Sequence, residues 1–364
     1  MTANATNFIN PITFETLTGN KCLVDTFDRN FQFSVEHVSL AKQADVVMIA
    51  PASANVIGKL AGGIADDMLT TTVMACRCPK IVAPAMNTNM FENPIVQDNL
   101  KKLGRFGYEV VQPAVGLLAC KDVGAGKLPE PEVLADYITR SIAFEKDLAG
   151  KKILVTAGPT REPVDPVRYL TNHSTGKMGY ALAKICSLRG ADVTLVTGKT
   201  SIAPPRFVKT VEITTAHEMY EAVTKAFPDQ DIVIKAAAVA DYRPAIVSSE
   251  KIKKTEDTAE IRLERTEDIL ASLGSKKRPG QFLCGFSMET ENMLGNSRAK
   301  LAKKNLDMIV ANNLKVPGAG FAGDTNVVTL ITEKEETELP LMSKEETAVR
   351  ILDKILEMIS TEQR

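Results

Sequence analysis

The chain has 364 residues, more than one hydrophobic core usually serves, so two domains are expected. A formal net charge of −1 excludes a global field that would attract nucleic acid or an anionic membrane, so neither is expected as a partner. No signal peptide and no membrane-spanning apolar run are found, and six cysteines without zinc spacing predict free thiols in a cytoplasmic protein.

Apolar strand-like runs alternate with helical patterns in the first part of the chain. Strands are predicted at ADVVMIAPAS, PKIVAPAMN and YEVVQPA, and helices at GKLAGGIADDMLTTTVMAC, NPIVQDNLKKLGRFG and EPEVLADYITRSIAFE. Continuous apolar strands between helices predict a parallel, doubly wound α/β sheet. The opening segment TNFINPITFETLTGN is predicted to be helical or irregular, so a first strand–helix unit with a glycine-rich turn is expected to be missing.

The pattern restarts at KKILVTAGPT, after the charged segment FEKDLAGKK. We therefore expect domains at 1–147 and 148–364. The second contains the predicted strands ADVTLVTG, VKTVEIT, DIVIKAAAVADY, QFLCGFSME, LDMIVANN and NVVTLIT, with helices between several of them. This order predicts a second doubly wound, Rossmann-like α/β domain, in which ligands bind at the carboxyl ends of the strands.

Polar side chains follow the predicted strands of the first domain. Ser53 and Asn55 could bond a phosphate or a ring edge, although a helix cap is the simpler interpretation. Asn87 is a fixed amide near a strand end or an ordinary turn residue. His37 is predicted on a helix, where a lone histidine is more often structural. Cys120 precedes a Gly-Ala-Gly run, and a thiol on a mobile, glycine-rich loop is a candidate proton donor.

The segment GPTREPVDPVRYLTNHSTGKMG predicts a long loop that leads into a helix. It matches neither GxGxxG nor GxxxxGK[ST], and no acidic residue ends the next strand, which argues against an NAD site. Residues 174–179 supply hydroxyls and backbone N–H groups at a helix N-terminus, which is a ready anion site. Small side chains at Ala237 and Ala238 let a ligand approach a strand end. Lysines of SSEKIKK, together with Lys300 and Lys304 on one helix face, suggest a polyphosphate ligand.

Four motifs of the first domain, PASANVIGK, PAMNTNM, the histidine of EHVSLAKQAD and LLACKDVGAGKLPEP, resemble the flavin-dependent cysteine decarboxylases, and phosphopantothenoylcysteine decarboxylase in particular. The resemblance implies FMN as an electron sink, with Ser53 and Asn55 at the cofactor. It also implies that His37 is the active-site base or orienter, that Asn87 binds the substrate carboxylate and that Cys120 protonates the product.

The motifs LVTAGPTREPVDPVRYLTNHSTGKMG, KAAAVADYRP, KIKK, GFSMET and AKKNLDMIVAN resemble phosphopantothenate–cysteine ligases, and the two domains together resemble the bacterial bifunctional family of coenzyme A biosynthesis. The resemblance implies that CTP, with Mg²⁺, activates 4′-phosphopantothenate as an acyl-CMP, from which cysteine displaces CMP. Asn172 is then expected to bind the acyl intermediate, Arg168 to support that site and Lys251 to stabilise the CTP phosphates. The expected nucleotide-binding residues are Ala237, Ala238, Asp241, Phe286, Lys300 and Lys304.

Three hypotheses stay open on the sequence. The chain is a bifunctional enzyme, or it is a ligase whose first domain acts as an oligomerisation scaffold that binds flavin weakly or not at all. The third is a nucleotide-binding NAD(P) reductase, which the absent glycine fingerprint disfavours. The resemblance further implies a homo-oligomer, built from ligase dimers and a higher assembly through the flavin domains. No metal-ligand cluster is predicted.

Overall fold

The computed structural model describes residues 1–27, 36–118, 121–253, 260–289, 292–313 and 323–362. The chain divides into two compact units, Met1–Phe144 (unit 1) and Glu145–Arg364 (unit 2), and each is described by itself. None of the helices within the described ranges has both the length and the apolar composition that crossing a membrane requires.

Unit 1 is built on a parallel sheet of three strands in the order β1 (Val47–Ala52), β2 (Lys80–Pro84) and β3 (Tyr108–Val110). An antiparallel hairpin, β4 (Ala114–Leu117) and β5 (Val123–Lys127), follows the sheet. The helices of this unit are η1 (Ala3–Asn7), α1 (Pro11–Thr18), α2 (Glu36–Gln43), α3 (Ala54–Gly62), α4 (Met68–Ala75), α5 (Thr88–Glu92), α6 (Pro94–Arg105) and α7 (Pro131–Ile142).

Helices cover both faces of the unit 1 sheet, because side chains of a strand alternate between its two faces. Ile49 and Val82 pack with apolar side chains of α3 and α6 on one face. Ile81 and Ala83, one residue away along β2, pack on the other face with Leu134, Tyr137 and Ile138 of α7. The predicted α/β class of this unit is therefore confirmed.

The single helix predicted at GKLAGGIADDMLTTTVMAC is wrong, because the chain forms two helices there. α3 begins earlier, at Ala54, and ends at Gly62, because the next residue, Gly63, caps the helix in the left-handed conformation with φ 72°. α4 starts anew after Asp67, whose side chain forms a capping box with Thr70. The loop predicted around the Gly-Ala-Gly run is also wrong, because Gly124 and Gly126 lie in strand β5.

Unit 2 contains a sheet of eight strands in the order β10-β9-β6-β11-β14-β15-β16-β17. The first six strands of this order run parallel to one another. At one edge of the sheet, β16 runs antiparallel to both of its neighbours, β15 and β17. The strands are β6 (Lys152–Ala157), β9 (Asp192–Gly198), β10 (Lys209–Ile213), β11 (Ile232–Lys235), β14 (Phe282–Glu289), β15 (Met308–Asn313), β16 (Thr325–Thr332) and β17 (Glu336–Ser343).

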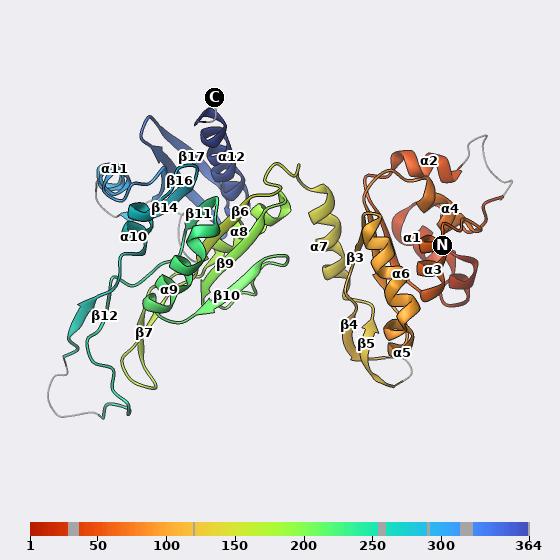
Figure 1. The fold of residues 1–364 in the computed structure, drawn as a ribbon, viewed down its shortest axis with the longest axis horizontal. Coiled ribbons are helices and arrows are strands. Elements are labelled where there is room, and N and C mark those ends of the chain that lie inside the picture. Colours follow the sequence, from red (N-terminus) through yellow and green to blue (C-terminus); the bar gives the residue numbers. More distant parts are fainter. Residues whose placement is uncertain (28–35, 119–120, 254–259, 290–291, 314–322, 363–364) are drawn as a thin grey trace. The chain divides into compact units, whose positions relative to one another are not determined.

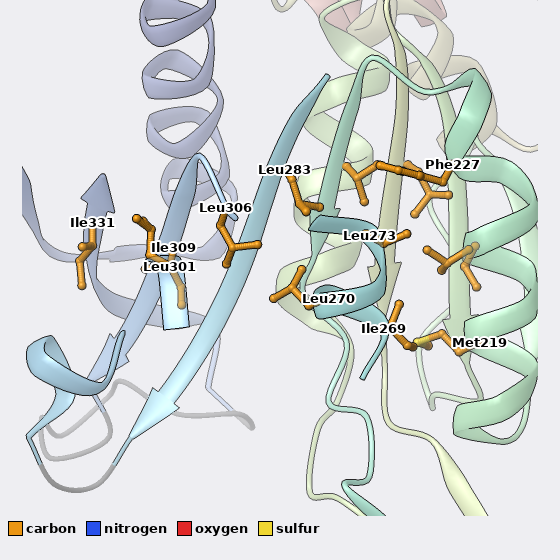
Figure 2. Packing of buried hydrophobic residues seen from close by; sticks show 14 of the residues in the cluster. Met219, Phe227, Ile269, Leu270, Leu273, Leu283, Leu301, Leu306, Ile309 and Ile331 are labelled. Atoms are coloured by element: carbon orange, nitrogen blue, oxygen red, sulfur yellow. The ribbon is translucent and has the colours of Figure 1, made fainter. Parts of the chain in front are cut away.

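Five α-helices in the described part of unit 2 flank this sheet: α8 (Lys177–Leu188), α9 (Ala216–Ala226), α10 (Ile269–Lys276), α11 (Met293–Lys303) and α12 (Lys344–Glu362). A short 3₁₀ turn, η2 (Phe227–Asp229), follows α9. Figure 2 shows the core under α9, α10 and α11, where Met219, Leu273 and Leu301 face strand residues such as Leu283 and Ile309. α8 contacts β6 and β9 and packs against α12.

Two further hairpins extend the loops at the carboxyl ends of the unit 2 strands. The long loop predicted after β6 contains β7 (Arg161–Pro163) and β8 (Tyr169–Thr171). The segment after β11 contains β12 (Tyr242–Pro244) and β13 (Leu263–Arg265). β7 and β12 contact each other and extend from the sheet side by side (Figure 1). These pairings bring the two longest loops of the unit together.

Candidate active sites

The strand-end loops after β6 and β11 are joined at the carboxyl edge of the unit 2 sheet. Pro159 and Ala238 form an isolated parallel bridge, and the Ala238 N–H donates to the Gly158 carbonyl at 3.0 Å. The Asn172 side chain reaches the same point, because its Nδ2 donates to the Ala238 carbonyl at 3.1 Å. The fold therefore brings Asn172 next to Ala237 and Ala238, although these residues belong to separate sequence motifs. The Asn172 side chain is exposed there.

Arg168 is fixed by a buried carboxylate that also binds the main chain at Ile252. Asp165 is 3% exposed and accepts from Arg168 Nε at 2.9 Å and Nη2 at 2.5 Å. Asp165 also accepts the Ile252 N–H at 3.2 Å, and Arg168 Nη2 donates to the Ile252 carbonyl at 3.1 Å. The guanidinium holds the pKa of Asp165 well below its usual range. Because Lys251 precedes Ile252, this network brings Arg168 and Lys251 to one corner.

Glycines press the first turn of α8 against the end of β6. Gly176 precedes the helix with φ 79°. A Cβ on Gly179 would lie 2.5 Å from the Ala157 Cβ, and one on Gly176 would lie 2.8 Å from the Thr200 Cγ2. Only glycine permits this approach, which sets the N–H groups of the α8 N-terminus at the carboxyl edge of the sheet. Such a terminus favours an anion.

A small cavity opens beside this helix N-terminus. It measures about 60 Å³ and is lined by residues 174–179 together with Phe286, Asn312, Asn326 and Lys344, among others. The Oδ1 atoms of Asn312 and Asn326 are buried and accept no hydrogen bond within the described part of the chain. Unpaired buried acceptors call for donors, because an unmade hydrogen bond costs about 1–3 kcal/mol. The cavity therefore suits a group with N–H or O–H donors.

The predicted lysines of α11 lie at the corner between α10 and α11. Lys304 donates from Nζ to the carboxylate of Asp268, at 3.1 Å to Oδ1 and 2.9 Å to Oδ2. Lys300 lies one turn earlier on α11 and is partly buried. Asp241, in the loop after β11, is exposed, and its carbonyl accepts from the Thr266 N–H at 3.0 Å. Asp241, Asp268 and Lys304 act electrostatically on Lys235, the last residue of β11, so this corner lies near that strand end.

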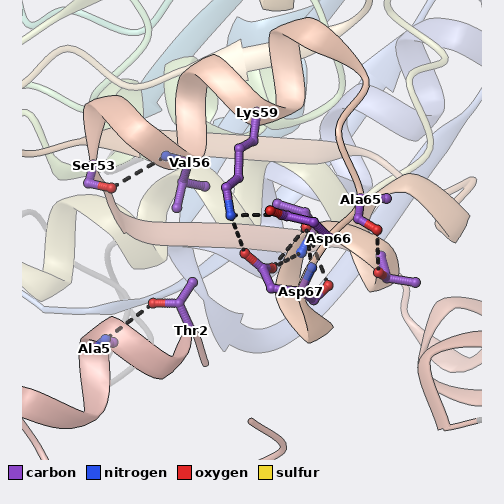
Figure 3. A network of polar contacts seen from close by, with 10 residues as sticks. Thr2, Ala5, Ser53, Val56, Lys59, Ala65, Asp66 and Asp67 are labelled. Atoms are coloured by element: carbon purple, nitrogen blue, oxygen red, sulfur yellow. Dashed lines mark hydrogen bonds and ion pairs between the residues drawn. The ribbon is translucent and has the colours of Figure 1, made fainter. Parts of the chain in front are cut away.

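Side chains at the carboxyl edge of the unit 1 sheet cap the helices that follow them. Ser53 Oγ accepts from the Val56 N–H at 3.4 Å at the start of α3 (Figure 3). Asn87 Oδ1 accepts from the Asn89 N–H at 2.9 Å at the start of α5. The two loops are neighbours, because the Ala85 N–H donates to the Ala52 carbonyl at 3.1 Å. Exposed Ser53 and Asn55 and partly buried Asn87 thus share one edge.

Lys59 joins α3 to the start of α4. Its ammonium lies 2.7 Å from Asp66 Oδ1 and 3.0 Å from Asp67 Oδ2, as Figure 3 shows. The hydrogen bonds to Asp66 and then Asp67 raise the pKa of Lys59. The two aspartates therefore hold α3 through Lys59, and Ser53 caps the N-terminus of the same helix.

The β4–β5 hairpin is docked on the Asn87 loop through glycines. The Met86 N–H donates to the Gly126 carbonyl at 3.0 Å. A Cβ on Gly126 would lie 2.2 Å from the Met86 carbonyl oxygen, and one on Gly124 would lie 2.4 Å from Thr88 Oγ1. Cys120 falls between β4 and β5 in the sequence and lies outside the described residues. The docking therefore sets the segments flanking Cys120 against the loop of Asn87.

His37 lies apart from the other predicted residues of unit 1. It is partly buried on α2. Figure 1 shows α2 at the opposite end of this unit from α5 and the β4–β5 hairpin. The chain as described thus brings Ser53, Asn55 and Asn87 together and does not bring His37 to them.

Sequence reasoning missed Asp165 and Asp268, which hold Arg168 and Lys304. A local signal for Asp165 exists, because aspartate before proline often starts a turn. Asp268 opens α10, a helix that the sequence reading did not separate from its surroundings. Among the described residues, no group of three or more His, Cys, Asp or Glu side chains is placed so that it could hold a metal ion.

Both edges suit the groups that the motifs imply. In unit 2, a helix N-terminus, lysines and unpaired amide oxygens suit a nucleotide with phosphate, sugar and base. In unit 1, small residues and exposed Ser53 and Asn55 at a helix N-terminus suit the phosphate or ring edge of a flavin.

Comparison with known proteins gives a family for each part of the chain. Residues 1–143 match the family model Flavoprotein, and residues 148–359 match the model of the DNA/pantothenate metabolism flavoprotein C-terminal domain. The chain is 46% identical over 359 residues to the coenzyme A biosynthesis bifunctional protein CoaBC of Bacillus subtilis (strain 168), covering 98% of this chain and 88% of that protein.

Two other similarities extend the comparison. A cysteine/cysteine sulfinic acid decarboxylase from an unknown prokaryotic organism is 42% identical over 357 residues, covering 96% of this chain and 99% of that protein. A crystal structure of the C-terminal domain of a CoaBC protein matches 59% of this chain and 98% of its own, with 46% identity and a TM-score of 0.51. The chain therefore belongs to the family of coenzyme A biosynthesis bifunctional proteins, which combine phosphopantothenate–cysteine ligase and phosphopantothenoylcysteine decarboxylase activities in one chain.

Proposed function

We propose that unit 2 joins cysteine to 4′-phosphopantothenate at the expense of CTP, through an acyl-CMP intermediate, and that unit 1 decarboxylates the product with FMN to give 4′-phosphopantetheine. One observation carries the ligase assignment. Asn172, the β11 strand end and the α8 N-terminus meet at one edge, with the Arg168–Asp165–Ile252 network beside Lys251. We propose residues 1–147 as the decarboxylase domain and residues 148–364 as the ligase domain.

The ligase reaction has two steps at this edge. A carboxylate oxygen of 4′-phosphopantothenate attacks the α-phosphorus of CTP, and the bond to the β-phosphate oxygen breaks to release pyrophosphate. The amine of cysteine then attacks the acyl carbon and expels CMP. Lys251 is proposed to offset the charge that builds on the phosphates in the first step, and Asn172 to hold the acyl intermediate for the second.

The remaining predicted residues are proposed to bind the nucleotide. Phe286 lines the small cavity and offers a ring face to the base. Lys300 and Lys304 supply positive charge at the α10–α11 corner, and the small side chains of Ala237 and Ala238 let the ligand lie against the strand end. Asp241 lies exposed at the same edge. Mg²⁺ is proposed to enter with CTP, because divalent cations bridge triphosphate oxygens.

In unit 1, Ser53 and Asn55 are proposed to hold FMN, which supplies reversible two-electron oxidation when bound. The Asn87 amide is proposed to donate from Nδ2 to the carboxylate that leaves, since its Oδ1 accepts the Asn89 N–H. His37 is proposed as base or orienter and Cys120 as the proton donor. The assembly is proposed to be a homo-oligomer, which light scattering of the purified chain measures directly.

The ligase proposal is tested with the purified chain, CTP, Mg²⁺ and 4′-phosphopantothenate. We expect pyrophosphate release only when 4′-phosphopantothenate is present, and CMP release with phosphopantothenoylcysteine formation once cysteine is added. ATP replaces CTP in the control. Absence of CTP turnover in all of these mixtures would refute the proposal.

Flavin content and decarboxylation separate the bifunctional enzyme from a ligase with a scaffold domain. The bifunctional enzyme shows flavin absorbance and releases CO₂ from phosphopantothenoylcysteine. Free cysteine serves as the competing substrate, since one similar protein bears the name of a cysteine decarboxylase. A colourless chain that ligates cysteine but releases no CO₂, even with added FMN, supports the scaffold alternative.

A further inference from the structure

Lys235 is the last residue of the central strand β11. The two proposed reaction steps give this lysine no role. Its neighbours in the sheet are Thr156 of β6 and Gly285 of β14. Side chains alternate along a strand, so Lys235 lies on the same face as Val233, a member of the core under α9, α10 and α11. Ala236, on the other face, lines the cavity beside α8. Lys235 therefore flanks the carboxyl edge on the α10–α11 side.

The charged groups around Lys235 leave its ammonium without a bond. Lys304 at the end of α11, Asp268 at the start of α10 and Asp241 in the following loop act on it electrostatically. Lys304 is engaged by both oxygens of Asp268. Over the described ranges, the ammonium of Lys235 has no hydrogen-bond or ion-pair partner, and the residue is partly buried. Burial, and then repulsion from Lys304, lower the pKa of Lys235 to about 8.

A partly buried ammonium without a bonding partner is unfavourable, because burial disfavours the charged form. An oxygen acceptor placed at the carboxyl edge would offset the burial, because hydrogen bonds between an ammonium and an anionic oxygen are among the stronger ones in proteins. An ordinary solvated lysine needs no such acceptor, but it is exposed and keeps its normal pKa. Lys235 differs from it in both respects.

We infer that Lys235 is a nucleotide-binding residue of the ligase site, whose ammonium donates to an acceptor oxygen of CTP from the α10–α11 side. The inference rests on the proposed ligase function. A phosphate oxygen and the carbonyl oxygen of the pyrimidine share the required chemistry. Cytidine keeps the pyrimidine carbonyl and lacks every phosphate, so it distinguishes the two sources.

The test measures CTP binding to the full chain by calorimetry, without 4′-phosphopantothenate, so that no turnover occurs. At pH 7, Lys235→Met is expected to weaken binding about 10- to 100-fold, the effect of losing one charge-assisted hydrogen bond. Lys235→Arg keeps the charge and should retain most of the affinity. Lys225→Met is the matched control, because Lys225 is exposed in the last turn of α9. The CTP affinity of Lys225→Met should equal that of the unchanged chain.

A pH series separates a binding role from a structural one. Lys235 loses its proton as pH rises through about 8, so the CTP affinity of the unchanged chain should fall above that pH. This fall should be absent in Lys235→Met. Because the charged form is disfavoured in the folded protein, Lys235→Met should also raise the melting temperature of unit 2 at pH 7.

The outcomes are decisive in each direction. A loss for CTP but not for cytidine assigns the contact to a phosphate oxygen, and an equal loss for both assigns it to the base. Unchanged affinity and an unchanged pH dependence in Lys235→Met overturn the inference. The inference is also overturned if Lys235→Met melts at a lower temperature and its CTP affinity still falls above pH 8. Failure of the unchanged chain to bind or use CTP refutes the ligase proposal instead.

Discussion

The proposed ligase site of unit 2 and the proposed flavin site of unit 1 hold their side chains by contacts of different range. Asn172 bonds to Ala238, 66 residues away, and Arg168 bonds to Ile252, 84 residues away. In unit 1, Ser53 and Asn87 instead bond main-chain groups two or three residues further on. A ligase side chain is thus positioned by distant parts of the fold, whereas a flavin-site side chain also starts a helix. Mutations should therefore act differently in the two units.

The largest effect is expected at Asp165, where one buried carboxylate holds Arg168 and the Lys251 segment together. Asp165→Asn removes the charge that binds the guanidinium and leaves an amide among main-chain N–H donors. We expect the ligation rate to fall by about 10³-fold, the upper end of what loss of one preorganised group costs. Steady-state pyrophosphate release measures it.

Asp147→Asn is the matched control for Asp165→Asn. Asp147 also binds an arginine with two oxygens, Arg189, at 2.9 Å and 2.5 Å, but outside the proposed site. It should lower the stability of unit 2 and leave the ligation rate within a factor of about two, as expected for independent sites. Equal rate losses in both variants would show that Asp165 acts on stability alone.

The second prediction separates the two steps of ligation. Lys251→Gln should slow activation by about 10²-fold, because charge builds on the phosphates in that step. Asn172→Asp should leave activation largely intact and block attack by cysteine, since a carboxylate repels the intermediate's phosphate and disturbs its alignment. Quenching reactions that lack cysteine should reveal acyl-CMP with Asn172→Asp and little with Lys251→Gln. Equal accumulation in the two variants contradicts this division of roles.

The third prediction concerns the docking of the β4–β5 hairpin in unit 1. Gly126 has φ 135°, and a Cβ there would lie 2.2 Å from the Met86 carbonyl oxygen. Gly126→Ala should destabilise unit 1 by about 2–3 kcal/mol, as expected for strain at a glycine-only conformation. Amide hydrogen exchange of unit 1 in the full chain measures it, and ligation by unit 2 should be unaffected.

Gly116→Ala is the control within the same hairpin. A Cβ at Gly116 meets only the Lys127 Cδ at 3.6 Å, an ordinary contact, and its φ is not positive. It should leave unit 1 within about 0.5 kcal/mol of the unchanged chain. Similar losses in the two variants would mean that the hairpin tolerates no alanine anywhere, which contradicts a specific contact of Gly126 with Met86.

The contrast in contact range also explains what the sequence could predict. Strand positions and the α/β class follow from apolar runs, and the Ser53 and Asn87 loops follow from motifs that are local. The Asp165 contact with Ile252 spans 87 residues, and no local pattern contains it. The break at Gly63 was missed because the apolar pattern continues across it, while backbone conformation decided the outcome. The edge strand β17 was missed because Glu336, Glu338 and Pro340 interrupt its apolar residues, and proline within a run argues against a strand.

The smallest effect is expected at Ser53, where capping and flavin binding are proposed to share one hydroxyl. Ser53→Ala removes the cap of α3 and should cost about 1 kcal/mol of local stability. Ser53→Asp keeps a capping oxygen, because aspartate caps as well as serine, but places a negative charge where the flavin phosphate is proposed to bind. Hydrogen exchange at Val56 and FMN fluorescence titration measure the two properties separately.

The two Ser53 variants should therefore diverge in one measurement and not in the other. Exchange protection should fall in Ser53→Ala and persist in Ser53→Asp, while FMN affinity falls in both and further in the aspartate. Asn93→Ala, which removes the equivalent cap of α6, should lose local protection there without weakening FMN binding. If Ser53→Asp binds FMN as the unchanged chain does, Ser53 serves only as a cap, and the overlap of folding and binding proposed for unit 1 does not exist at this residue.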